Sequence, residues 1–135
     1  MPLGRRIAPR PARLVIPDQA WLTQYGKRWS PEVSDFRCRP RTGLETDISV
    51  LTGLLAPEEA TKLVTGRSAT RSDAVRFARA GELKAAGFFV ASTPTKRIPN
   101  HASVTVPGGH VPWSDDQVLA FEFCWQEVDR DALER

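Results

Sequence analysis

The stretch AVRFARAGELKAAGFFVASTPTKRIPNHASVTV, residues 74–106, decides the fold class of this chain. Its first part, residues 74–78, is apolar enough to predict a strand. Residues 80–86 then predict a short helix, and Gly87 is a typical helix stop. The apolar run at residues 87–91 predicts a buried strand.

The second half of the stretch indicates a return strand. Residues 92–100 contain two prolines and predict a loop, and residues 102–106 predict the strand that follows it. One alternative stays open, a single long helix over residues 73–86, in which Gly81 would cost about 1 kcal/mol relative to alanine.

Two further elements precede this stretch. Residues 47–52, DISVLT, alternate apolar and polar side chains and predict a strand. Residues 57–65 predict a helix, because Pro57 suits a first helical turn and Gly66 suits the position after the last.

The N-terminal third gives weaker signals. Residues 14–16 are apolar but too few for more than a strand fragment. A short helical turn is expected to begin at Asp18 and end at Gly26. Residues 26–43 predict irregular chain held by aromatic side chains.

The C-terminal segment admits two predictions. Ser114 and Gln117 match a capping box, which favours a helix over residues 115–131. A strand over residues 117–125 stays open because apolar residues alternate there: Leu119, Phe121, Phe123 and Trp125.

Together these elements predict an α+β fold, a small mixed or antiparallel sheet with two or three helices packed on one face. The length of 135 residues suits a single domain over residues 14–135, preceded by a basic arm rich in proline and arginine at residues 1–13. No run of about 18 apolar residues predicts a membrane span. Two cysteines are too few for a secreted disulfide scaffold, so we expect a cytoplasmic protein, and the many arginines and alanines suggest a bacterial one.

Charge is distributed unevenly along the chain. Residues 1–41 carry nine basic and three acidic groups, whereas residues 115–135 carry seven acidic and two basic groups. Such asymmetry either attracts a charged partner or lets the two ends neutralise each other.

His101 is the main candidate for catalysis. A histidine titrates near neutral pH and is the usual general acid or base, and Lys96 and Arg97 in the preceding loop could stabilise an anion. These three groups would suit a metal-independent nuclease. The alternative is that His101 fixes the loop by a ring hydrogen bond and that the two cations are solvated.

The basic N-terminal third holds the candidate binding residues. Arg37, Arg39 and Arg41 alternate, so an extended chain would present them to one side about 6.6–6.8 Å apart, near the spacing of phosphates along a single strand. Trp29 could stack on a base nearby. The arm adds four more candidates: Arg5, Arg6, Arg10 and Arg13.

Other sites are not expected. The sequence has no phosphate-binding glycine loop, dinucleotide fingerprint, nucleophile elbow or zinc-spaced cluster, so we expect no cofactor and no metal. Cys38 and Cys124 are expected to be reduced, with a redox pair between them as the alternative.

Four short motifs resemble a loosely defined group of small, uncharacterised bacterial domains. They are DISV at 47–50, LAPEEA at 55–60, AGELKAAGFFV at 80–90 and PNHASV at 99–104. The resemblance implies the order helix, strand, loop, strand over residues 79–106 and draws attention to His101, but it implies no activity. Lys84 departs from the arginine of the pattern, and Asn100 directly precedes His101 instead of being spaced from it.

The sequence therefore favours a non-catalytic interaction domain, an accessory subunit of a bacterial protein assembly that contacts another protein chain, with no membrane contact. Two alternatives remain: a small metal-independent nuclease or toxin-like enzyme that uses His101, and nucleic-acid binding without chemistry through the basic N-terminal half.

Overall fold

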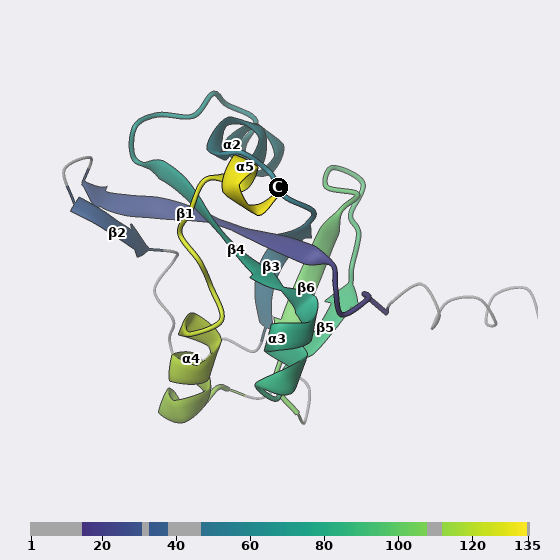
Figure 1. Cartoon of the computed structure of the whole chain (residues 1–135). Helices are drawn as coiled ribbons and strands as arrows, with labels where there is room; N and C mark the ends of the chain where they lie inside the picture. Colours follow the sequence, from purple (N-terminus) through teal and green to yellow (C-terminus); the bar gives the residue numbers. More distant parts are fainter. Residues whose placement is uncertain (1–14, 31–32, 38–46, 108–111, 135) are drawn as a thin grey trace, which may run out of the picture.

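The computed structural model of the chain describes residues 15–30, 33–37, 47–107 and 112–134, and for residues 29–30 and 33–37 it describes the backbone alone. In these residues a six-stranded sheet, antiparallel in every pairing, is combined with helices (Figure 1). The predicted α+β class is therefore confirmed.

Strand β1, Trp21–Ser30, lies at the centre of the sheet. Strand β4, Asp73–Arg79, pairs with β1 continuously from Trp21 to Lys27. Both β3, Asp47–Thr52, and β2, Val33–Arg37, pair with residues of β1 that β4 also contacts. They must therefore share the opposite edge of β1, with β3 near its start and β2 at its end.

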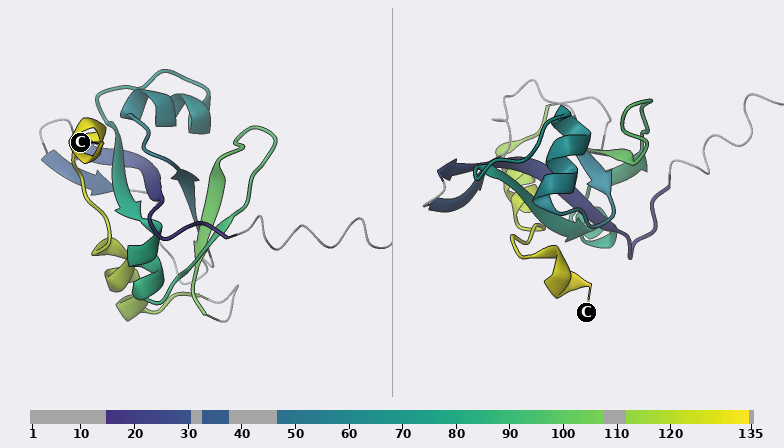
Figure 2. Two further views of the ribbon diagram at one scale, coloured as in Figure 1. Left: turned by 45° about the vertical axis from the view of Figure 1, so that its right-hand side comes forward. Right: turned by 90° about the horizontal axis from the view of Figure 1, so that it is seen from above.

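The sheet continues from β3 through β6, His101–Thr105, to β5, Phe89–Ser92. The β1–β2 end and the β5–β6 hairpin lie on opposite sides of the molecule in both views of Figure 2. Val15 forms an isolated bridge with Ala91 on the outer edge of β5. Of the predicted strand fragment at 14–16, residues 15 and 16 are described, and Val15 makes the bridge.

The helical turn predicted from Asp18 to Gly26 is wrong, and so is the prediction of irregular chain for residues 26–30 and 33–37. The apolar spacing in this segment suggested a helix, but β1 is buried on both faces, so apolar residues do not alternate simply along it. Its buried polar side chains are satisfied: Thr23 Oγ1 donates to the carbonyl of Gly53 at 2.7 Å, and Gln24 accepts from Arg76. Tertiary pairing on two edges overrides the local preference.

One face of the sheet packs on two helices. Leu22 of β1, Val50 of β3 and Val104 of β6 form its core with side chains of α3, Ala80–Ala85, and α4, Asp115–Glu122. The single helix over 73–86 is excluded, because residues 73–79 pair with β1 and only the following residues are helical.

The other face packs on the remaining helices. Leu51 of β3 and Phe77 of β4 contact Ala60 of α2, Pro57–Thr65, and Leu133 of α5, Arg130–Leu133. Figure 1 shows α2 and α5 at the top and α3 and α4 at the bottom. Helices therefore cover both faces and not one as predicted, because β1, β3 and β4 each present apolar side chains to both sides.

The helix at 57–65 is confirmed residue for residue. Gly66 adopts the left-handed conformation, φ 79°, and its N–H donates to the carbonyl of Lys62 at 2.8 Å. The helix near 80–86 and the strands near 47–52, 74–78, 87–91 and 102–106 are confirmed to within two residues at each end.

The last predicted helix is too long. Helix α4 ends at Glu122, and the strand alternative for 117–125 is wrong, since α4 occupies most of it. The helix cannot continue to residue 126, because the backbone of Gln126 forms two hydrogen bonds with the backbone of Phe77 of β4, at 2.8 and 2.9 Å.

Candidate functional site

His101 begins β6 and is half-buried. Its Nδ1 lies 2.9 Å from both the backbone carbonyl and the side-chain hydroxyl of Thr93, and that hydroxyl lies 2.8 Å from Ser103 Oγ. A carbonyl can only accept, so Nδ1 of neutral His101 carries the proton and Nε2 is left as an acceptor. The ring thus fixes the β5–β6 loop, as the structural alternative predicted.

The two predicted cations do not join His101. Arg97 donates to the carbonyl of Val64 at 2.8 Å, which satisfies an end of α2. Lys96 is exposed, and in the part of the chain that is described no hydrogen bond or ion pair links it to His101. Ile98, which follows, is buried and anchors the loop. Lys96, Arg97 and His101 are therefore close in sequence but do not form a joint site, because Arg97 binds the end of α2.

His101 belongs to a polar half-face of the sheet that we call the open face: Val15, Asp47, Ser49, Phe89, Ala91, His101, Ser103 and Thr105. The register places Ala91, Ser103 and Ser49 side by side in one row. Phe89 is 57% exposed and Val15 is 69% exposed. None of the eight is buried, so no described element covers this face.

Most of the predicted binding arginines lie outside the described residues: Arg5, Arg6, Arg10, Arg13, Arg39 and Arg41. Arg37 ends β2, and its backbone pairs with Lys27 of β1. Trp29 lies on β1, and Cys38 lies outside the described residues. Cys124 carries a free, buried thiol whose pKa is raised by burial and by neighbouring Glu82. It is a weak nucleophile at neutral pH.

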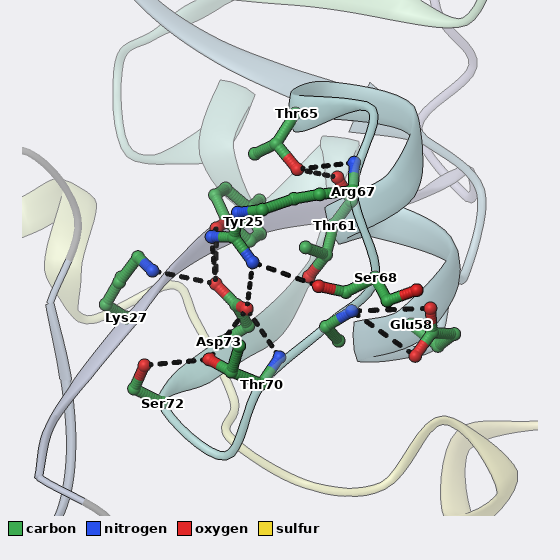
Figure 3. Close-up of polar contacts among 11 residues, drawn as sticks. Tyr25, Lys27, Glu58, Thr61, Thr65, Arg67, Ser68, Thr70, Ser72 and Asp73 are labelled. Atoms are coloured by element: carbon green, nitrogen blue, oxygen red, sulfur yellow. Dashed lines mark hydrogen bonds and ion pairs between the residues drawn. The ribbon is translucent and has the colours of Figure 1, made fainter.

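The most connected polar group is one that the sequence did not reveal, and we call it the Asp73 cluster: Tyr25, Lys27, Arg67, Thr70 and Asp73 (Figure 3). The Asp73 side chain is fully buried at the start of β4. Its Oδ1 accepts from Tyr25 at 2.5 Å and from Lys27 at 3.1 Å. Its Oδ2 accepts from Arg67 at 2.9 Å and from the Thr70 N–H at 2.8 Å.

These contacts fix the charge of the cluster. The hydrogen bonds from Arg67, with smaller effects from Tyr25 and Thr70, hold the pKa of Asp73 far below its usual range. Burial and the bond to Asp73 raise the pKa of Tyr25. Asp73 is therefore an anion at every physiological pH, and it cannot serve as a general acid or base.

A second ion pair, between the buried Arg76 and the partly exposed Glu122, holds α4 to the sheet. Arg76 of β4 is 5% exposed and donates two bonds to Glu122, at 2.6 and 3.0 Å, and one to Gln24 at 2.8 Å. Its guanidinium also lies over the rings of Phe121 and Trp125. These contacts are structural, because they connect β1, β4 and α4.

A groove of about 680 Å³ separates the start of α2 from residues 127–131. Both arginines that line it contact carboxylates: Arg28 lies 3.9 Å from Glu127, and Arg130 pairs with Glu59. No three potential metal ligands gather among the described residues. The groove thus offers neither a free cation nor a metal site in the part of the chain described.

None of the described helices has both the length and the apolar character needed to cross a membrane. Comparison of the chain with protein-family models, with curated proteins and with solved structures gave no match.

Proposed function

We propose that this protein is a non-catalytic interaction domain that binds another protein chain through the open face, as an accessory subunit of a bacterial assembly in the cytoplasm. The observation that carries the proposal is the exposure of Phe89 and Val15 on one sheet face. An exposed aromatic side chain among small and polar residues is typical of the centre of a protein interface.

The register supports this role for Phe89. Val15 pairs with Ala91, which lies two residues from Phe89 on the same strand, so both apolar side chains face the same side. The neighbouring row of Ala91, Ser103 and Ser49 carries short side chains, which leave room for a partner to approach closely.

The segment that precedes Val15 in the sequence is strongly basic. Residues 1–13 carry four arginines and connect to the open face through Val15. A basic segment next to an apolar contact suits a partner whose surface is acidic around an apolar centre.

The test compares two aspartate substitutions of exposed phenylalanines. Phe89→Asp charges the open face, and Phe123→Asp makes the same change at the end of α4, where Phe123 is 80% exposed. Each tagged full-length variant would be purified from the native cell after nuclease treatment, with circular dichroism to confirm folding. We expect a stoichiometric protein partner that Phe89→Asp loses and Phe123→Asp keeps.

The proposal fails if the partner is lost equally with both variants, or if no stoichiometric protein accompanies the wild-type chain. Removal of residues 1–13 is a second variant that leaves the described core unchanged. It should weaken the same complex, because the arm adjoins Val15.

A second candidate function is a small hydrolase that uses His101, and one observation favours it. The Thr93 carbonyl accepts the Nδ1 proton, which leaves Nε2 without a hydrogen bond to any described residue and able to accept a proton. His101→Ala should then abolish cleavage of an RNA substrate with folding unchanged, whereas loss of the protein partner in the same variant would speak for a binding role.

A further inference from the structure

We propose that the end of the sheet around Asp73 binds the sugar–phosphate backbone of a nucleic acid. The site is a cationic patch formed by Lys27, Arg67 and Arg71. It lies at the β1–β2 end of the sheet, away from the β5–β6 hairpin, so it does not depend on the function proposed for the open face.

Asp73 gathers two of these cations at a defined spacing. Lys27 comes from β1 and Arg67 from the turn after α2, and both reach the same buried carboxylate, at 3.1 and 2.9 Å. Their side chains remain 50% and 43% exposed, so the two charges are held in place and still face water. Because the two side chains are already ordered before binding, the entropic cost of binding an anion is lower.

Further positive charge surrounds this pair. Arg71 lies in the same turn, is exposed, and has no hydrogen bond or ion pair with any described residue. Two carboxylates offset part of this charge, Asp73 and Glu58, and both accept hydrogen bonds from the turn itself.

The chemistry of the patch favours phosphate over a protein surface. The turn supplies hydroxyl groups from Ser68, Thr70 and Ser72 next to the cations (Figure 3). Arginine, lysine and hydroxyl side chains are the groups that contact phosphate oxygens in nucleic-acid complexes. None of the large apolar side chains that are exposed among the described residues belongs to β1 or to the turn, so the patch itself lacks the apolar anchor of a protein interface.

The experiment measures binding of the full chain to a short fluorescent oligothymidylate by anisotropy, at salt concentrations from about 50 to 200 mM. Three phosphate contacts predict a slope of log K against log salt of about −2, since each contact to a single strand contributes about −0.7. Lys27→Gln with Arg71→Gln should flatten the slope by about 1.4, the share of two contacts.

Lys96→Gln is the matched control, because Lys96 is an exposed lysine in the β5–β6 loop on the other side of the molecule (Figure 1). It should leave the slope unchanged. If the double variant is poorly folded, Arg71→Gln alone replaces it, since Arg71 makes no described contact and should flatten the slope by about 0.7.

Three results would overturn the inference: no binding at the lowest salt, a slope that Lys27→Gln with Arg71→Gln does not change, or equal affinity for polyglutamate. The last would mean that the patch attracts any polyanion, an acidic protein included. Phe89→Asp should not affect oligonucleotide binding, so failure of this inference is distinguishable from failure of the open-face interaction.

Discussion

Replacement of Asp73 by asparagine removes one charge from the most connected buried side chain of the molecule and hardly changes its shape. The wild-type carboxylate accepts from five groups on two segments, β1 and the turn after α2, and the partners include two cations. In Asp73→Asn an NH₂ group replaces one carboxylate oxygen, and its hydrogens then face the N–H or O–H donors that this oxygen accepted from. Arg67 and Lys27 then lose their common anion.

The magnitude follows from burial. Breaking a buried charge pair from one side costs about 3–5 kcal/mol when the remaining charge stays dry. Here the remaining charges are about half exposed and regain water, so we expect a loss near the lower limit, about 3 kcal/mol. Asp47→Asn is the control: Asp47 is an exposed aspartate at the start of β3, and its substitution should change stability by less than about 0.5 kcal/mol.

The pH dependence gives an independent check. The folded-state pKa of Asp73 is depressed, so its stabilisation is complete above the pKa of an unfolded aspartate, about 3.9. It is lost progressively as pH falls below that value toward the folded pKa. The wild-type chain should therefore keep its advantage over Asp73→Asn from neutral pH down to about pH 4 and lose it progressively below that pH.

Urea denaturation at neutral and acidic pH measures both effects, since the midpoint shifts with stability at constant slope. The reasoning is refuted if Asp73→Asn is no less stable than Asp47→Asn at neutral pH. It is also refuted if the difference between wild type and Asp73→Asn grows as the pH is lowered.

Further predictions concern the core and the helix ends, and denaturant unfolding tests all of them. Arg76→Met should cost about 2 kcal/mol, because Gln24 loses its donor and the half-exposed Glu122 regains water; a neutral effect would mean that the pair does not hold α4. Phe121→Ala should cost about 3–5 kcal/mol, since a fully buried ring in contact with three aromatic neighbours is removed. Gly66→Ala should cost about 1 kcal/mol through backbone strain alone, because φ is 79° and nothing lies within 4 Å of the added Cβ. Gly81→Ala should not stabilise α3 despite its helical position, since the new Cβ would lie 3.0 Å from a backbone carbonyl; a stabilisation of about 1 kcal/mol would contradict this.

Elements with strong local signals were predictable from the chain alone. Helix α2 matches its predicted bounds because Pro57 and Gly66 restrict the backbone at its two ends, whatever packs around them. Strand β3 likewise matches the alternation at 47–52. Residues 80–106 follow the predicted order because glycines and prolines separate each element from the next.

Strand β1 and the end of α4 were not predictable, because each depends on contacts between segments that are far apart in sequence. The centre of the sheet is buried on both faces, so Trp21 and Leu22 both lie in apolar surroundings and the alternation that marks a strand disappears. The end of α4 depends on backbone bonds between Gln126 and Phe77, which are far apart in sequence. No local residue pattern encodes such pairings.

The candidate sites show the same contrast between features set by local sequence and features set by tertiary contacts. The α+β class, the order of the helices and strands between residues 47 and 106 and the uneven charge follow from local backbone preferences and composition, so the chain alone predicts them. Three pairings come from the folded sheet: Arg97 donates to α2 and not to a site at His101, Phe89 and Val15 share a face, and the buried Asp73 binds Lys27 and Arg67. Such juxtapositions depend on strand register, and register is set by the whole sheet and not by any one segment.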